Sequence, residues 1–520
     1  MGHRAGAWSV AVVFAWGLAS GATYASGTPT SVVTTERGPV RGIEAEGVRV
    51  FRGIRYAQPP VGELRWRAPQ PADAWREIKE ATSFGAACSQ PARAANDRRP
   101  DGLGAAPESS SEDCLFLNVW TPRTTGTAPV MVWLHGGAHR FGAASLPFYD
   151  GTQLAKQGVV LVSVNYRLGL FGYFAHPALS AAADEAGGNY GLMDQIAALR
   201  WVRRNIAAFG GDPDNVTVFG ESAGGASTLY LLTNPAARGL FAKAIVESGG
   251  GWQRTLNRSQ KEQEGVAAVR SVGLTAAVTA EQLRKLTAEQ LNEAVKVAPL
   301  LNFGPFVDGT LVTASPAEMF ARGQAHDVPL IIGWNSHEAS LLDASGAPPA
   351  AILKMFEPDQ LQQLRAIYSE SHSDDALAQA IFGDSSFGAP ARWIAARMES
   401  GAPAWLYHFD YTLEARRGAI GANHAAEIPY VFGTLDRIPA LRAFVSKRDE
   451  AMARMISACW VAFAKQGRPV CDGAPSWPAY RAETDELLKF AVATQVVPQF
   501  RKNALDYHTD LHMKSAGEFR

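Results

Sequence analysis

The stretch that decides the fold is Val216-Thr-Val-Phe-Gly220-Glu-Ser222-Ala-Gly224-Gly225, followed by an apolar segment at 226–232. Its branched and aromatic residues predict a buried strand, and the apolar segment predicts a helix. Between them lies G-x-S-x-G, a sharp turn in which small neighbours leave a serine hydroxyl exposed above a sheet. Ser222 is therefore the candidate nucleophile of a serine hydrolase.

Short apolar runs rich in branched residues recur along the chain and predict further buried strands. Helical patterns separate several of them, and the clearest covers 190–209 and stops at Gly210-Gly211. This alternation predicts an α/β fold with a doubly wound, mostly parallel central sheet. Residues 259–299 and 350–398 lack strand patterns and predict helical insertions over the active-site end of the sheet. The expected strands are 129–134, 159–165, 216–219, 244–246, 328–334 and 404–409.

Residues 130–138, Val-Met-Val-Trp-Leu-His-Gly-Gly-Ala, predict a buried strand that ends in a glycine-rich loop. In an α/β hydrolase, the oxyanion binds the N–H after the nucleophile and N–H groups of a loop that follows an earlier strand. We therefore assign Gly137, Ala138 and Ala223 as the oxyanion-hole donors. A simple glycine turn is the alternative explanation of this loop.

The acid and the base of such a site follow the nucleophile in chain order, each after a later strand. Glu338 follows the strand at 328–334 and is the candidate acid. His424 follows the strand at 404–409 and is the candidate base. Taken singly, such loop residues are usually solvated, and their order after Ser222 favours the catalytic roles. The competing candidates are Asp343 and Asp308, the latter in a predicted turn, as acids and His337 as base.

The N-terminus predicts an export signal over residues 1–25. His3 and Arg4 precede an uncharged apolar stretch and small residues that end at Ala25. An apolar run of about 13 residues suits a cleavable signal and is too short to cross a bilayer as a helix. An uncleaved anchor is the alternative. We expect a secreted or periplasmic protein without stable membrane insertion, in which residues 26–520 form a single α/β-hydrolase domain.

The charge balance excludes several partner classes. The 520 residues contain 49 Lys+Arg against 50 Asp+Glu, a formal net charge of -1. A nucleic-acid partner is not expected, because the basic footprint that phosphate backbones require is missing. The four cysteines are an even number in a chain predicted to be exported, which favours disulfides over metal sites. Cys88 and Cys114 enclose a polar segment that suits a surface loop tied at its base, and parity favours pairing Cys459 with Cys471.

Further motifs lie between residues 51 and 224. They are Phe51-Arg-Gly-Ile-Arg-Tyr-Ala-Gln-Pro-Pro60, Leu64-Arg-Trp66, Ser111-Glu-Asp-Cys-Leu-Phe-Leu-Asn-Val-Trp120, Asn165-Tyr-Arg167, Gly188-Asn-Tyr-Gly-Leu-Met-Asp-Gln195 and Phe219-Gly-Glu-Ser-Ala-Gly224. With these motifs the chain resembles the type B carboxylesterases, the family that includes the cholinesterases.

The resemblance implies an exported serine carboxylic ester hydrolase on the α/β-hydrolase fold. It would act on a small-molecule ester through an acyl-enzyme, with no metal and no organic cofactor. Position by position, it implies Ser222 as nucleophile, Glu338 as acid and His424 as base. It also implies a Cys88 to Cys114 disulfide and ion pairs of Arg65 with Glu112 and Arg167 with Asp194.

Two departures from the family pattern concern the substrate. His139 and Arg140 stand where the family has an aromatic residue after the oxyanion glycines, and we expect both to bind substrate. A guanidinium at Arg140 would favour carboxylated or polycarboxylate esters such as fumonisin-type substrates, unless the side chain points to solvent or pairs with an acid. The loop between Cys88 and Cys114 contains no aromatic residue, which disfavours choline esters.

Two rival functions remain open from the sequence. A catalytically silent binding module is disfavoured, because Ser222, Glu338 and His424 are all present. An amidase would use the same residues, so the sequence does not separate it from an esterase. The oligomeric state is not predicted.

Overall fold

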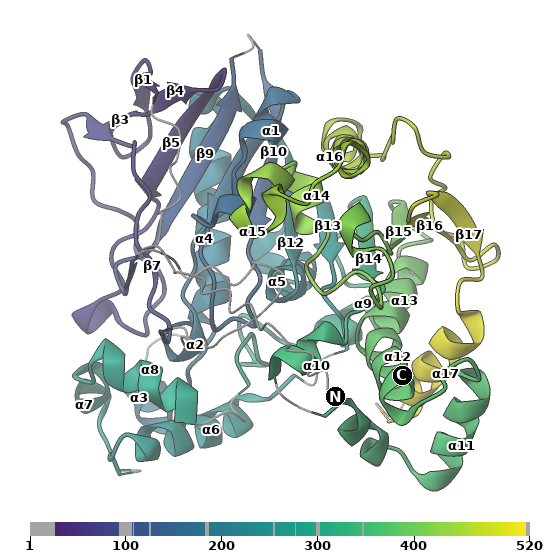
Figure 1. Cartoon of the computed structure of the whole chain (residues 1–520). Helices are drawn as coiled ribbons and strands as arrows, with labels where there is room; N and C mark the ends of the chain where they lie inside the picture. Colours follow the sequence, from purple (N-terminus) through teal and green to yellow (C-terminus); the bar gives the residue numbers. More distant parts are fainter. Residues whose placement is uncertain are drawn as a thin grey trace, which may run out of the picture.

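Figure 1 shows the computed structural model of the chain, described for residues 27–92, 107, 109–123, 126–182, 187–252, 255–275, 277–297, 302–345 and 348–515. The predicted export signal at 1–25 lies outside these ranges, so its cleavage stays a prediction. None of the described helices is long and apolar enough to cross a membrane.

A twelve-stranded sheet forms the centre of the described chain. In spatial order its strands are β1 (Thr28–Pro29), β4 (Ile43–Ala45), β5 (Val48–Arg55), β9 (Phe116–Pro122), β11 (Val160–Val164), β10 (Ala128–Leu134), β12 (Gly211–Glu221), β13 (Lys243–Glu247), β14 (Leu330–Asn335), β15 (Ala404–Phe409), β16 (Glu486–Phe490) and β17 (Gln495–Pro498). From β11 to β16 neighbouring strands are parallel, and antiparallel strands flank them at both edges. Smaller sheets contain β2 (Val33–Thr34), β3 (Pro39–Arg41) and β6 (Lys79–Glu80), and β7 (Ala87–Cys88) with β8 (Ser110–Ser111).

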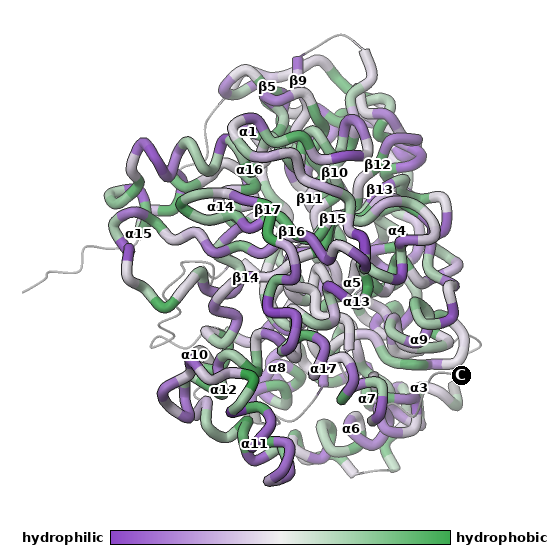
Figure 2. The backbone as a smooth tube through the Cα atoms, turned by 90° about the vertical axis from the view of Figure 1, so that its right-hand side faces the viewer, coloured by the Kyte–Doolittle hydropathy of each residue, from purple (hydrophilic) through white to green (hydrophobic). Residues whose placement is uncertain are grey.

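Helices cover both faces of the sheet, as Figure 1 shows. In chain order they are α1 (Thr152–Lys156), α2 (Gly169–Gly172), α3 (Pro177–Ala182), α4 (Tyr190–Asn205), α5 (Ala223–Leu232), α6 (Arg258–Ser271), α7 (Ala280–Arg284), α8 (Ala288–Val297), α9 (Pro316–Ala321), α10 (Ser340–Ser345), α11 (Pro358–Ile367), α12 (Asp374–Gly383), α13 (Ala389–Arg397), α14 (Ile428–Phe432), α15 (Pro439–Arg442), α16 (Lys447–Gln466) and α17 (Lys502–Ser515). Figure 2 shows hydrophilic residues along the outer helices α7 and α11.

The central strands are buried on both sides, which explains their continuous apolar runs. Successive residues of a strand point to opposite faces. In β10, Val130 and Val132 pack in the core that contains residues of α4 and α5. Met131 and Trp133 pack in a second core with residues of α14 and α16. One strand therefore anchors both helical layers.

The structure confirms the predicted α/β-hydrolase fold with its doubly wound, mostly parallel sheet. The six expected strands correspond to β10 through β15, with different ends. For example, β14 begins at Leu330 and not at Val328, because Pro329 has no N–H for a sheet hydrogen bond. The predicted helix at 190–209 is α4 followed by a 3-10 turn, and Gly210 ends it with φ +87°.

The two predicted helical insertions are present as α6 to α8 and as α11 to α13. Both reach the carboxyl ends of the parallel strands. Arg140, in the loop after β10, donates a hydrogen bond to the Val295 carbonyl of α8. A Cβ built on Gly383 of α12 would lie 3.9 Å from Cβ of Glu338, which follows β14. This end of the sheet is where the candidate catalytic residues lie.

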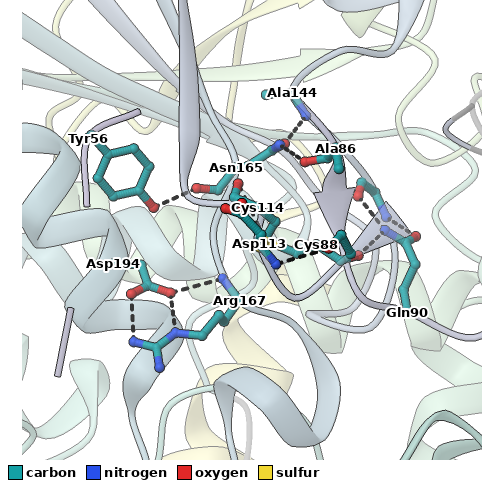
Figure 3. The surroundings of a disulfide bond; sticks show 12 residues. Tyr56, Ala86, Cys88, Gln90, Asp113, Cys114, Ala144, Asn165, Arg167 and Asp194 are labelled. Carbon is teal, nitrogen blue, oxygen red and sulfur yellow. Dashed lines mark hydrogen bonds and ion pairs between the residues drawn. A yellow bond between two sulfur atoms is a disulfide. The ribbon is translucent and has the colours of Figure 1, made fainter. Parts of the chain in front are cut away.

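Both predicted cysteine pairs are at disulfide distance. The sulfur atoms of Cys88 and Cys114 are 2.03 Å apart, and those of Cys459 and Cys471 are 2.08 Å apart. Figure 3 shows the first pair, which joins β7 to the segment that leads into β9. This link closes the base of the loop that the sequence predicts between Cys88 and Cys114.

The two ion pairs that the family resemblance implies are also present. Arg167 Nη2 lies 2.7 Å from Asp194 Oδ1, and both side chains are almost fully buried (Figure 3). Arg65 Nε donates to Glu112 Oε2 at 2.6 Å. Each arginine joins segments that are far apart in the sequence. Because each buried charge has a paired counter-charge, removing one partner would be strongly destabilising.

Candidate active site

Ser222 lies at the turn between β12 and α5. Its backbone has φ +55° and ψ −119°, a sparsely populated conformation for a residue with a side chain. The Ser222 N–H donates to the Glu247 carbonyl at 2.9 Å and holds the turn. A Cβ at Gly224 would clash with the Leu134 carbonyl, so the turn requires glycine there. This strained geometry leaves Ser222 partly exposed at the carboxyl end of the sheet.

The glycine-rich loop after β10 packs against this turn. A Cβ at Gly136 would lie only 3.2 Å from Cβ of Ser222. Gly137 and Ala138 have positive φ values, +108° and +54°. Within the described part of the chain, no hydrogen bond uses the N–H of Gly137, Ala138 or Ala223. These donors are therefore available for an oxyanion beside Ser222, which favours that role over a simple glycine turn.

Glu338 and His424 meet because they follow neighbouring parallel strands, β14 and β15. His424 Nδ1 lies 2.5 Å from Glu338 Oε2. The other carboxylate oxygen accepts hydrogen bonds from the Ser248 hydroxyl at 2.6 Å and the Asn335 N–H at 2.7 Å. The backbone N–H of His424 donates a hydrogen bond to Ser340 Oγ at 2.9 Å. Both members of the pair are thus oriented by fixed partners.

The second ring nitrogen of His424 faces the turn that carries the nucleophile. Nε2 lies 3.0 Å from Oε1 of Glu221, the residue that precedes Ser222. No hydrogen bond of the Ser222 hydroxyl occurs among the described residues. In unliganded hydrolases the contact between nucleophile and base is often loose and tightens when substrate binds.

Two of the competing candidates, His337 and Asp308, make other contacts in the described part of the chain. The His337 N–H donates to the Ala422 carbonyl at 2.8 Å, and the hydrogen bond to Glu338 comes from His424. Asp308 Oδ1 accepts the Thr310 N–H at 2.7 Å, which fits the predicted turn. Asp343 belongs to α10, and its side chain lies outside the described part of the structure.

Three further carboxyl groups are buried beside these residues. Glu221, Glu247 and Glu427 have exposed fractions of 2%, 0% and 1%. The Trp460 indole N–H donates to Glu247 Oε1 at 2.7 Å. The Asn335 side-chain amide donates to Glu427 Oε2 at 2.5 Å. Such a group of buried acids in one place favours the protonated form of some of them.

The charges in this cluster shift several pKa values. Burial raises the pKa of Glu427 to about 8, and the negative charges of Glu221 and Glu338 act in the same direction. Burial also raises the pKa of Glu247 well above its usual value, assisted by Glu427. Burial alone would lower the pKa of His424, but Glu221 and Glu338 raise it well above the ordinary value. At neutral pH, Glu427 is therefore mainly protonated.

Comparison with known proteins identifies the family. The model of the carboxylesterase family matches residues 29–508. The chain belongs to this family. The para-nitrobenzyl esterase of Bacillus subtilis (strain 168) is 40% identical over 475 residues, which cover 88% of this chain and 94% of the relative. The fumonisin B1 esterase of Sphingopyxis macrogoltabida is 34% identical over 470 residues, covering 87% and 85%.

Solved structures agree with this assignment. A structure of PNB esterase superposes with a TM-score of 0.80 at 36% identity, covering 91% of this chain and 99% of that one. The carboxylesterase EST55 of Geobacillus stearothermophilus gives a TM-score of 0.80 at 35% identity, covering 92% and 100%. The protein is thus a carboxylic ester hydrolase with an α/β-hydrolase fold, and small esters are its substrates.

In this carboxylesterase, the residue after the oxyanion loop is a buried histidine. His139 is 5% exposed, and its Nε2 lies 3.0 Å from Ser227 Oγ. The Gln195 side-chain amide donates to the same hydroxyl at 3.0 Å. Burial lowers the pKa of His139 to about 3, so the ring is neutral. These contacts tie the loop to α4 and α5, and contact of His139 with substrate stays a prediction.

Within the described residues, Arg140 neither points freely to solvent nor pairs with an acid, the two alternatives to substrate binding that the sequence left open. It is only partly exposed, and its guanidinium donates to the Val295 carbonyl at 3.1 Å. It lies 5.4 Å from the ring centroid of Phe141 and 5.2 Å from that of Phe303. Arg140 forms no ion pair within the described residues. Neither free exposure nor an acidic partner therefore describes it, and its binding of substrate stays a prediction.

Sequence reasoning missed the buried acids Glu221, Glu247 and Glu427. Glu221 is the last residue of β12 and Glu247 is the last residue of β13. The residues that precede them in these strands are mainly apolar. A carboxylate at such a position is the available signal, because buried acids are rare unless they are paired or functional. Glu427 follows His424 by three residues and carries no comparable signal.

Proposed function

We propose that this carboxylesterase is exported and acts through an acyl-enzyme formed on Ser222. Ser222 Oγ attacks the ester carbonyl carbon while His424 Nε2 accepts the hydroxyl proton. The alcohol then leaves with that proton, and an ester bond to Ser222 remains. Water, activated by His424, attacks this ester and releases the acid. Glu338 holds the imidazole in the required tautomer and stabilises its charged form.

The oxyanion of both tetrahedral intermediates would accept the N–H groups of Gly137, Ala138 and Ala223. The observation that carries the proposal is the 2.5 Å contact of His424 Nδ1 with Glu338 Oε2 beside a serine held in a strained turn. The chemistry uses groups of the chain together with the ester and water. It requires residues 26–520 to act as one hydrolase domain.

The test is labelling with a fluorophosphonate, followed by peptide mapping. Wild type should be modified at Ser222 alone, and Ser222→Ala should stay folded while losing about 10⁶ in kcat. His424→Ala should lose activity, with His337→Ala as its matched control. Modification at another serine, or a His337→Ala variant that fails while His424→Ala works, would contradict the assignment.

Two further measurements address the rivals and the export signal. Initial rates on a matched ester and amide separate an esterase from an amidase, and absence of turnover on both would favour a binding module. The protein recovered from the periplasm or medium should begin at Ser26. A cytoplasmic product that retains residues 1–25 would contradict export.

A second candidate concerns carboxylated esters, such as those of fumonisin type. It is favoured by the uncompensated guanidinium of Arg140 directly after the oxyanion loop. The 34% identity to a fumonisin B1 esterase points in the same direction. The test compares kcat/KM for a neutral ester and its carboxylated analogue in wild type and Arg140→Ala. An unchanged ratio of the two substrates would exclude Arg140 from recognition.

A further inference from the structure

A pocket lies between the segment that follows β15 and the helices α14 and α15. Figures 1 and 2 both place α15 beside α14. Two strongly exposed apolar residues, Ile420 and Phe444, lie close in sequence to the lining residues. The apolar part of the lining consists of Leu413, Ala419, Ala422, Ala426, Pro429, Leu435 and Leu441.

One hydroxyl group in the lining has no hydrogen-bond partner within the described residues. Tyr430 is 3% exposed, and its hydroxyl forms no hydrogen bond within the described residues. The neighbouring Tyr411 differs, because its hydroxyl donates to Asp449 Oδ1 at 2.8 Å. Burial and the Asp449 charge raise the pKa of Tyr430, so its hydroxyl remains a donor. The Tyr430 hydroxyl is therefore free to donate a hydrogen bond to a ligand in the pocket.

A positive charge lies at the same pocket. Arg416 lines it and forms no ion pair within the described part of the chain. Its charge is close enough to Tyr430 to lower the pKa of that hydroxyl, against the larger effect of burial. The next residue, Arg417, is paired with Glu414 at 2.7 Å. The pocket therefore combines apolar walls, an unpaired guanidinium and an unpaired hydroxyl donor.

We propose that this pocket binds amphipathic carboxylates. The apolar ring or chain would pack among the leucine and tyrosine side chains, and the carboxylate would accept hydrogen bonds from Arg416 and Tyr430. The acids that ester hydrolysis releases have this chemistry. The pocket is separate from the catalytic residues, but its wall includes residues 421–423, which lead directly to His424.

The test is calorimetric titration of the full mature enzyme, with its catalytic serine blocked by a fluorophosphonate. The ligands are 2-naphthoate and its neutral analogue 2-naphthylmethanol. Arg416→Ala should weaken the binding of 2-naphthoate about tenfold and leave the binding of the alcohol unchanged, because only the charged contact is lost. Ala419→Trp, at an exposed lining position, should weaken both ligands about tenfold by filling the space. The matched control, Arg417→Ala, should change neither by more than about twofold.

Tyr430→Phe removes only the hydroxyl and should weaken the carboxylate without weakening the alcohol. The proposal is overturned if 2-naphthoate shows no saturable binding up to about 5 mM. It is equally overturned if 2-naphthoate binds both the Arg416→Ala and the Ala419→Trp variant as tightly as it binds wild type. It is also overturned if 2-naphthoate binds the unblocked enzyme but not the enzyme whose serine is blocked. If Ser222 did not react with the fluorophosphonate, this result would count against its proposed catalytic role. The binding measurements on the variants would still test the pocket.

Discussion

Glu338→Gln should remove most turnover without unfolding the enzyme, because the donors around Oε1 fix the orientation of the new amide. Oε1 accepts the Ser248 hydroxyl and the Asn335 N–H at 2.6 and 2.7 Å. The glutamine carbonyl oxygen must keep this position, so the amide NH₂ group faces His424 Nδ1. A donor there forces the imidazole proton onto Nε2, the atom that must accept the proton of Ser222.

The magnitude follows from this tautomer. In serine hydrolases, an amide in place of the orienting carboxylate lowers kcat by about 10⁴, which corresponds to about 5.4 kcal/mol of activation free energy. Both hydrogen bonds to Oε1 persist, so the thermal unfolding temperature should change little. The assay is kcat on a small ester, with thermal unfolding followed by circular dichroism.

The matched control is Glu281→Gln, which makes the same change at an exposed helical position paired with Lys285. It should keep wild-type kcat. A folded Glu338→Gln variant that retains kcat within about tenfold of wild type would refute the tautomer argument. Loss of activity together with loss of the folded state would show that Glu338 is mainly structural.

Three other predictions concern the buried cluster and the turn. Glu221 raises the pKa of His424, so Glu221→Gln should let the imidazole stay neutral to lower pH and shift the acid limb of kcat/KM to lower pH. Glu427 binds its proton more tightly in the folded state, with a pKa of about 8 against an ordinary value of 4.5. The free energy of unfolding should therefore fall as pH rises from about 4.5 to 8, by up to about 1.4 kcal/mol per unit from this group, and Glu427→Gln should flatten that slope in thermal unfolding. Gly224→Ala should lower the yield of folded enzyme, because its Cβ would clash with the Leu134 carbonyl.

The parts of the fold that sequence reasoning predicted are those with local signals. The parallel strands β10 to β15 have continuous apolar runs, and the turn at Ser222 has a motif whose glycines have a steric reason. The antiparallel strands β5 and β9 were not predicted. They pair with each other in an antiparallel register that shifts between Phe51 and Ile54, and such pairing depends on residues far apart in the chain.

The buried acids illustrate the same limit at the site. The partner of Glu247 is Trp460, 213 residues later in the chain, so its burial could not be inferred locally. The chain order of Ser222, Glu338 and His424 was informative because the topology of the fold fixes it. The orientation of Arg140 could not be predicted from the sequence, because it depends on Val295 in a distant helix.

The surroundings of His424 suit the charged imidazole better than the neutral one. Carboxylate oxygens face both ring nitrogens, Glu338 at 2.5 Å and Glu221 at 3.0 Å. A neutral ring has a proton on only one nitrogen, so one carboxylate would then face a lone pair. Once His424 has taken the proton of Ser222, its Nδ1–H donates a charge-assisted hydrogen bond to Glu338, and the nearby Glu221 carboxylate attracts the positive ring. The cluster therefore favours the tetrahedral intermediate over the resting state, at the cost of a raised pKa of the base.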